Sequence, residues 1–235
     1  MQYGLITLVS ILPAFGWLAY FYKTDKYEPE PKKLVLRTFL LGVFVAIALG
    51  TSYEGLPYPW GPSRYAAVLW APLIEETAKF LIVFWTVFSN KNFNEPIDGI
   101  VYASSAALGF AACENAFYVL SSWHSGSPEM GMFTLLGRSV FSVPGHALFS
   151  AFFGAALGYA KGMKGIKPVL LVILGLVLSM VAHGLFNYLS MVNTFSGLSF
   201  IVFMVLLWRL VYVKLLVPAQ EASPFRKQPS IPEVD

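Results

Sequence analysis

Charged residues and cysteine are scarce in this chain of 235 residues. Only 12% of the residues are charged and 57% are hydrophobic, whereas about 25% are charged in an average soluble domain. The mean hydropathy is +0.64. The shortage of charge therefore argues against a soluble fold. The single cysteine, Cys113, excludes an intrachain disulfide and a cysteine-rich zinc site. The small net charge of +3 gives no basis for nucleic acid as a partner.

Basic residues are also missing from the first 22 positions and follow only afterwards. A secretory signal peptide carries its positive charge before its apolar segment, so we interpret this segment as a retained first span. Apolar runs of bilayer length predict an all-α integral membrane protein, a polytopic bundle of about seven transmembrane helices. We expect one transmembrane domain over residues 1–217 and a disordered cytoplasmic tail over 218–235. The predicted spans are Tyr3–Tyr22, Leu34–Tyr53, Ala66–Phe88, Ile97–Leu120, Arg138–Ala160, Pro168–Ser190 and Leu198–Val217.

The basic residues are distributed unequally between the two sides of these spans. One side holds only Arg64 and Arg138, and we interpret Arg138 as an interface anchor. Because cytoplasmic connections are enriched in Lys and Arg, the N-terminus is predicted outside and the C-terminus in the cytoplasm. The basic residues of the predicted cytoplasmic side are Lys23, Lys26, Lys32, Lys33, Arg37, Lys91, Lys161, Lys164, Lys167, Lys214, Arg226 and Lys227.

Two adjacent carboxylates, Glu75 and Glu76, lie in the middle of the third predicted span and are followed by Lys79. Ionisable residues inside membrane spans are rare and usually mark a function. Residues three or four positions apart share a helix face. Lys79 can therefore neutralise one carboxylate and leave the other for chemistry.

The next three predicted spans carry polar side chains at a similar depth. At 1.5 Å per residue, the acidic and imidazole groups of the four spans lie roughly 9 to 14 Å from the predicted outer ends. Lipid offers no hydrogen-bond partners, so we expect these groups to meet in one cavity in the outer half of the membrane. Asn187, one turn after His183, is placed to hold that ring or a substrate carbonyl. The polar residues of these three spans are Glu114, Asn115, His146, His183 and Asn187.

Two hydrolytic mechanisms suit this set of residues. In the first, Glu114, His146 and His183 bind Zn²⁺ or another divalent metal, and a remaining glutamate is the general base. In the second, no cofactor is needed, because a desolvated glutamate and a histidine activate water directly. A histidine or Asn187 would donate hydrogen bonds to the developing oxyanion. The residues alone do not choose between the two mechanisms.

Two further functions use the same residue types. Glutamate and histidine inside spans also form proton relays, so a proton- or ion-coupled transporter is an alternative. Inverted repeats would favour a transporter, and we find no repeat in the sequence. The third hypothesis is a catalytically inactive scaffold.

Five segments together resemble the PrsW-type intramembrane proteases. Ala71–Lys79 is similar to their EExxK motif, and Glu95–Tyr102 with Gly109–Asn115 is similar to their second motif, FxxxEN. Two later segments resemble the histidine motifs, and an early one resembles the first cytoplasmic loop. The resemblance runs from about Pro13 to Asn187. These last three segments are Pro144–Ser150, His183–Asn187 and Asp25–Pro31.

The resemblance implies a multi-pass protease of a bacterial cell membrane, related to the CAAX prenyl endopeptidases and the Abi proteins. It implies Glu75, Glu76, Glu114, His146, His183 and Asn187 as catalytic residues, with Lys79 and Asn115 in support. The implied partner is a membrane-anchored protein substrate, an anti-sigma factor cut from the extracytoplasmic side. The group is described as metalloproteases, whereas its relatives are argued to be glutamate proteases.

Overall fold

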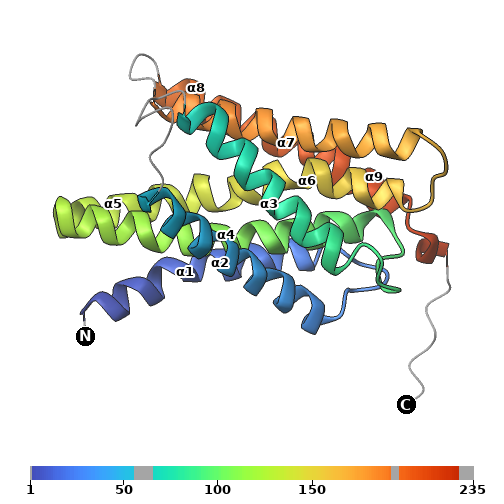
Figure 1. Cartoon of the computed structure of the whole chain (residues 1–235), viewed down its shortest axis with the longest axis horizontal. Coiled ribbons are helices and arrows are strands. Elements are labelled where there is room, and N and C mark those ends of the chain that lie inside the picture. The colour runs from blue at the N-terminus through green and yellow to red at the C-terminus, as the bar shows by residue number, and fades with distance from the viewer. Residues whose placement is uncertain (1, 56–65, 192–195, 228–235) are drawn as a thin grey trace.

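The structure is a computed structural model, and it describes residues 2–55, 66–191 and 196–227. All regular elements within these ranges are helical (Figure 1). The helices are α1 (Gln2–Tyr22), α2 (Lys32–Gly55), α3 (Ala71–Thr86), α4 (Pro96–Ser125), α5 (Pro128–Gly137), α6 (Val143–Ala160), α7 (Lys167–Met191), α8 (Ser196–Val211) and α9 (Val217–Glu221). Three π-helical turns, η1 (Ala66–Trp70), η2 (Arg138–Ser142) and η3 (Tyr212–Leu216), join or precede them, and a 3₁₀ turn, η4, covers Pro224–Lys227.

The predicted all-α membrane fold is confirmed. Six helices in the described ranges are long and apolar enough to cross a membrane. Each coincides with a predicted span, although α5 and η2 extend the fifth span toward the N-terminus. The remaining predicted span corresponds to η1 and α3, the segment that carries Glu75, Glu76 and Lys79. Arg64, which entered the orientation argument, lies outside the described residues.

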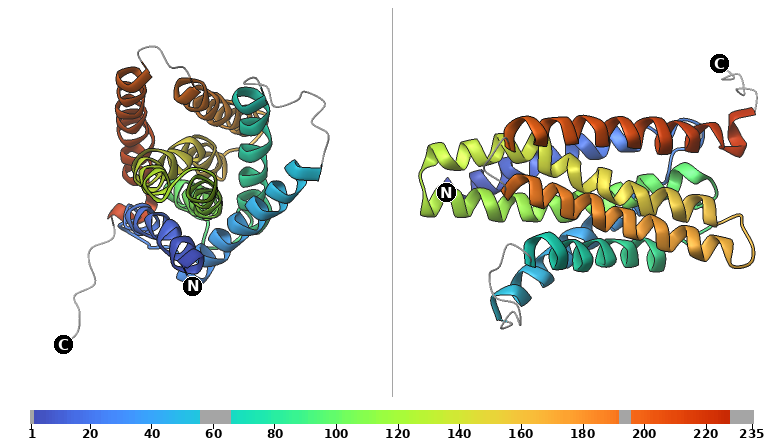
Figure 2. Two further views of the ribbon diagram at one scale, coloured as in Figure 1. Left: turned by 90° about the vertical axis from the view of Figure 1, so that its left-hand side faces the viewer. Right: turned by 90° about the horizontal axis from the view of Figure 1, so that it is seen from above.

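Helices α4 and α6 form the centre of the bundle. In the end-on view of Figure 2, helices α1, α2, α3, α7 and α8 surround this pair. Nearly every residue of α4 between Ile97 and Ala112 is buried, and so is nearly every residue of α6. The surrounding helices instead expose large apolar side chains such as Leu40, Phe44 and Leu206. Soluble monomers rarely expose such extended apolar surface, so these helices face lipid.

Glycines allow the two central helices to pack with their backbones in contact. A Cβ atom added to Gly99 of α4 would lie 2.1 Å from the carbonyl oxygen of Gly154 in α6. A Cβ added to Gly158, one turn further along α6, would lie 2.1 Å from the carbonyl oxygen of Pro96. Small residues four positions apart are the usual basis of close helix packing in membranes.

Each π-helical turn ends shortly before a proline. Pro72, Pro144 and Pro218 stand at the first or second position of the helices that follow η1, η2 and η3. Proline has no backbone N–H, and its ring clashes with the carbonyl group four residues earlier. That carbonyl belongs to the preceding wide turn in all three cases. The widened turn therefore relieves the clash and lets the helix continue.

The chain beyond Pro218 differs from the predicted disordered tail as far as it is described. Helix α9 continues to Glu221, and η4 adds a short turn over Pro224–Lys227. Ala219 and Ser223 are buried. Apolar burial at the end of the bundle accounts for this order. Residues 228–235 lie outside the described part of the chain.

We expect Gly99→Ala to destabilise the protein by about 2 kcal/mol, because the added methyl group forces α4 and α6 apart. The measurement is equilibrium unfolding in detergent micelles. Gly16→Ala in α1 is the matched control, since its Cβ would meet nothing within 4 Å. Equal stability of the two variants would show that the central helices do not pack as described.

Candidate active site

The carboxylate of Glu76 is the most heavily engaged polar group in the interior. Its Oε1 lies 2.8 Å from Lys79 Nζ and 2.9 Å from His183 Nδ1. Its Oε2 accepts hydrogen bonds from the hydroxyls of Ser150 and Ser179, both at 2.8 Å. The side chain is fully buried. Glu76 thus ties α3 to α6 and α7, and both of its oxygens are occupied.

Glu75 is held much more loosely. Its Oε2 lies 3.4 Å from Lys79 Nζ, which is its single ion-pair contact among the described residues. The Lys79 ammonium is closer to Glu76 than to Glu75 by this measure. The sequence predicted that Lys79 would neutralise one carboxylate and leave the other for chemistry. In the structure Lys79 contacts both carboxylates, and Glu75 is the less engaged of the two.

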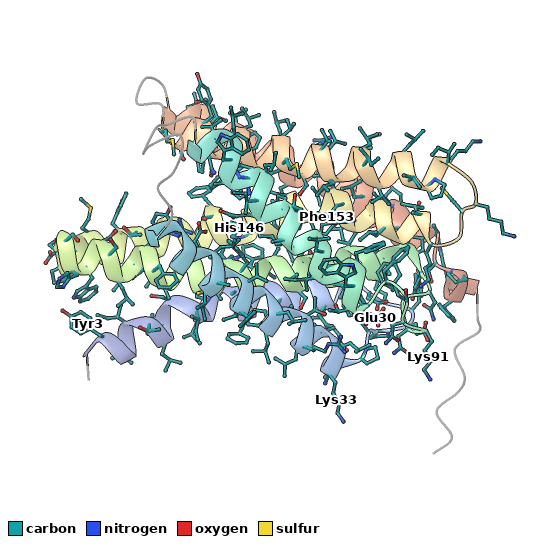
Figure 3. All side chains as sticks on the ribbon, in the orientation of Figure 1. Tyr3, Glu30, Lys33, Lys91, His146 and Phe153 are labelled. Carbon is teal, nitrogen blue, oxygen red and sulfur yellow. The ribbon has the colours of Figure 1, made fainter. Side chains whose placement is uncertain are left out.

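His146 lies between Lys79 and Glu114. Its Nδ1 is 3.0 Å from Lys79 Nζ, and its Nε2 is 2.9 Å from Glu114 Oε2. Because an ammonium group can only donate, Nδ1 accepts here and the Nε2–H donates to the carboxylate. Figure 3 shows His146 well inside the bundle, between its two ends. Both ring nitrogens therefore have partners in this arrangement.

Glu114 in turn is anchored by Arg138. The guanidinium Nη2 lies 2.6 Å from Glu114 Oε2, and Nε donates to the side-chain oxygen of Asn115 at 3.2 Å. Asn115 also donates to the backbone carbonyl of Ser10 in α1. The Arg138 guanidinium lies over the Tyr118 ring at 4.0 Å. Arg138, interpreted from sequence as an interface anchor, is instead part of the polar network.

The ring of His183 is fixed from two sides. Its Nδ1–H donates to Glu76, which leaves the Nε2 lone pair for another partner. Phe149 of α6 stacks on the ring with centroids 4.9 Å apart. The next residue, Gly184, permits close packing, because a Cβ there would lie 2.6 Å from the Val68 carbonyl oxygen of η1. The His146 and His183 rings meet edge to face at 5.1 Å.

Three of these side chains converge closely enough to share one metal ion. One oxygen of Glu75 and one nitrogen each of His146 and His183 lie within 4.8 Å of one another, and all three residues are buried. One carboxylate with two imidazoles is a known donor set of catalytic zinc sites. Ligand atoms of one tetrahedral zinc ion lie about 3.4 Å apart, so donors at the upper limit of the 4.8 Å separation have to move closer together to bind it. Metal binding also requires Lys79 or Glu114 to release one nitrogen of His146.

The structure therefore brings together nearly all the residues that the sequence singled out, with one change of grouping. The predicted metal ligands were Glu114, His146 and His183, whereas the compact group contains Glu75 in place of Glu114. Glu114 contacts His146 but is committed to Arg138. Asn187 follows His183 by one turn on α7 and is partly exposed. Nδ1 of the His183 ring lies 2.9 Å from Glu76 Oε1, and the predicted role of Asn187 stays a prediction.

Sequence reasoning missed Ser150, Ser179 and Phe149. A usable signal was present, because Ser150 follows His146 by four residues and Ser179 precedes His183 by four. This spacing puts each serine on the same helix face as its histidine. The role of Arg138 was missed because regular helical spacing does not apply across the π turn at its position.

Comparisons with known proteins show which family the sequence resembles. A family model described as PrsW family intramembrane metalloprotease matches residues 30–213. The protein named Protease PrsW from Geobacillus kaustophilus strain HTA426 is 32% identical over 98% of both chains. The protein of the same name from Bacillus subtilis strain 168 is 31% identical over 86% of this chain and 90% of its own. No solved structure matches the chain.

We expect Lys79→Met to destabilise the protein by about 3 kcal/mol, because it leaves two buried carboxylates without their shared cation. Lys79→Met combined with Glu76→Gln should recover part of the loss, since one of the two charges is then removed. Equilibrium unfolding in micelles measures both. Exposed Lys23→Met is the control. A double variant no more stable than Lys79→Met would contradict the pairing.

Proposed function

The chain belongs to the PrsW family of intramembrane metalloproteases, and from this premise we propose that it cleaves its substrate at the group formed by Glu75, His146 and His183. The reaction is hydrolysis of a peptide bond in a membrane-anchored protein. The convergence of these three side chains within 4.8 Å in the interior of the bundle is the observation that carries the proposal. Two imidazoles and a loosely held carboxylate around one point can hold a water molecule and take up its proton.

Glu75 is the residue we assign to proton transfer from the attacking water. Glu76 has both oxygens occupied by four hydrogen-bond donors, so it is poorly suited to accept another proton. Glu114 is committed to Arg138 and His146. Glu75, with one contact at 3.4 Å, retains the most capacity to move and to bind.

Glu76 and Glu114 are assigned as positioning residues. Glu76 accepts from Nδ1–H of His183 and so directs Nε2 toward the reacting water. Glu114, held by Arg138, orients His146 in the same way from the other side. Carboxylates that hold a histidine by its second nitrogen fix its tautomer and raise its basicity. Asn187, on the same helix as His183, remains our candidate donor to the developing oxyanion.

The family's description as metalloproteases is consistent with the same three residues. Glu75, His146 and His183 would hold the ion, and Zn²⁺ is the metal that this donor set favours. A bound zinc ion would lower the pKa of its water to about 7 and polarise the scissile carbonyl. If the ion binds to Nδ1 of His146, the Lys79 ammonium has to move away from this nitrogen. Lys79 would then be the side chain that moves when the metal binds.

An anti-sigma factor anchored in the same membrane is the substrate we propose, cut from the extracytoplasmic side. The named relatives are bacterial proteins, which supports a bacterial plasma membrane as the location. The orientation rests on the basic residues, which gather at the end of the bundle that holds Lys33 and Lys91 (Figure 3). With that end in the cytoplasm, the Glu75 group lies toward the outer side.

We expect Glu75→Gln and His183→Ala to lower kcat/KM at least about 100-fold, because each removes a group that handles the proton or the water. Cleavage of a membrane-anchored peptide by the full chain in liposomes is the measurement. Glu129→Gln is the matched control, since this exposed carboxylate of α5 lies outside the network. Retained cleavage by Glu75→Gln would refute the assignment. Proton flux without cleavage in wild type would favour a transporter.

We expect removal of bound metal by a chelator to abolish cleavage, and Zn²⁺ to restore it, because the group at Glu75 would lose its Lewis acid. Metal analysis of the purified chain accompanies the assay. Glu75→Gln should bind less zinc than Glu129→Gln. Full activity of metal-free protein would refute the metal site and assign water activation to Glu75 alone.

A further inference from the structure

A second group of buried carboxylates lies at the opposite end of α4 from the Glu75 group. Asp98 lies in the first turn of α4, and Glu114 follows it by sixteen residues, which corresponds to about 24 Å along the helix. Asp25 and Glu30 come from the connection between α1 and α2, and Glu95 from the connection between α3 and α4. Figure 3 shows Glu30 at the end of the bundle where Lys33 and Lys91 also lie.

These four carboxylates are buried but only partly satisfied. Each of their residues is at most 3% exposed. Asp98 Oδ2 accepts from the backbone N–H groups of Asn94 and Glu95, and Asp25 Oδ2 accepts from that of Glu30. The oxygens that have no hydrogen bond of normal geometry are Asp25 Oδ1, Glu30 Oε1, both Glu95 oxygens and Asp98 Oδ1. The Asp98 backbone N–H and the Ser223 side chain are the donors nearest to the Glu95 carboxylate in its capping arrangement. Native proteins leave few buried polar atoms unpaired, so such a concentration indicates a missing ligand.

No cation of the protein compensates these charges within the described residues. Every ion pair among the described residues joins a basic side chain to a carboxylate outside this group. Lys161 interacts electrostatically with Asp98, but it forms no ion pair with it, donates to the Phe88 carbonyl and lies over the Phe88 and Phe93 rings. Tyr102 donates to Glu30 Oε2 at 2.5 Å and is neutral. Burying several carboxylates without a counter-charge costs several kcal/mol for each.

Three of these carboxylates lie close enough together to surround one ion. One carboxylate oxygen each from Asp25, Glu95 and Asp98 lies within 4.8 Å of the other two. Ca²⁺ binds oxygen ligands at about 2.3–2.6 Å, so two of its ligands can lie up to about 5 Å apart. All the donors are oxygens, and no imidazole or thiolate belongs to the group. Oxygen-only sites select hard cations such as Ca²⁺ and Mg²⁺ over zinc.

We propose that Asp25, Glu95 and Asp98, with Glu30 beside them, bind a hard divalent cation that fastens the two connections to the start of α4. The site is separate from the Glu75 group in position and in donor chemistry, and it does not depend on the proposed peptidase function. The bound cation neutralises the buried carboxylates and joins two segments that are distant in sequence, residues 25–30 and 95–98.

Protons compete for the same group. Burial raises the pKa of Asp25 to about 7 and, despite the Tyr102 hydrogen bond, that of Glu30 to about 9. Without a cation, these carboxyls therefore retain protons near neutral pH. The titration that tests the site is accordingly done at mildly alkaline pH, where Asp25 is ionised.

The test titrates Ca²⁺, and separately Mg²⁺, into chelator-stripped full-length protein in detergent and follows the midpoint of thermal unfolding. We expect the midpoint to rise and to saturate with an apparent Kd of about 0.1–1 mM. Asp25→Asn and Glu95→Gln should weaken binding at least about tenfold. Glu28→Gln is the matched control, because this carboxylate belongs to the same connection as Asp25 but is exposed.

His183→Ala separates the two sites, and it should keep the Ca²⁺ response of wild type. A wild-type chain that shows no response to either cation overturns the proposal, whatever the variants do. So does a response that His183→Ala abolishes and Asp25→Asn retains, because the cation would then bind at the Glu75 group. A response of equal size in all variants also overturns it.

Discussion

The ammonium group of Lys79 is the cation on which the interior of this protein depends. It contacts Glu75, Glu76 and His146 and lies 4.3 Å from the centre of the Phe110 ring. Within a fully buried environment, each of these charges is stable only because the others are present. The contacts are uneven. Glu76 binds the ammonium, two hydroxyls and an imidazole, whereas Glu75 lies farther from the same ammonium. That unevenness leaves Glu75 as the less engaged of the two carboxylates.

The sequence predicted which residues meet in this network better than it predicted their hydrogen bonds. Bilayer-length apolar runs and the common depth of Glu75, Glu114, His146 and His183 sufficed to predict a shared cavity, because lipid supplies no alternative partners. The rotation of each helix was not predictable, since α4 and α6 are buried on nearly all sides and show no clear polar face. Which oxygen meets which nitrogen depends on that rotation. The exchange of Glu114 for Glu75 in the compact group follows from it.

The contact between α4 and α6 determines where both buried polar groups can form. Close approach at Gly99 and Gly154 fixes the relative height of the two helices. His146 lies two turns before Gly154 on α6 and contacts Glu114 of α4. Asp98 lies next to Gly99 on α4 and belongs to the second group of carboxylates. A single glycine-based register thus sets the geometry of the proposed active site and of the carboxylate group at the far end of the bundle. A substitution that disturbs the packing of α4 on α6 should therefore alter the geometry of both polar groups.

The π-helical turn at Arg138–Ser142 makes this segment sensitive to insertions and deletions. Arg138 and His146 both reach Glu114 although eight residues separate them, and on a regular helix of 3.6 residues per turn they would point about 80° apart. The wide turn forced by Pro144 changes this angle. Loss of one residue from this segment could restore regular winding without altering a single functional side chain, and the guanidinium would then turn away from its carboxylate. In alignments of such proteins, a gap in this segment is therefore as informative as a substitution.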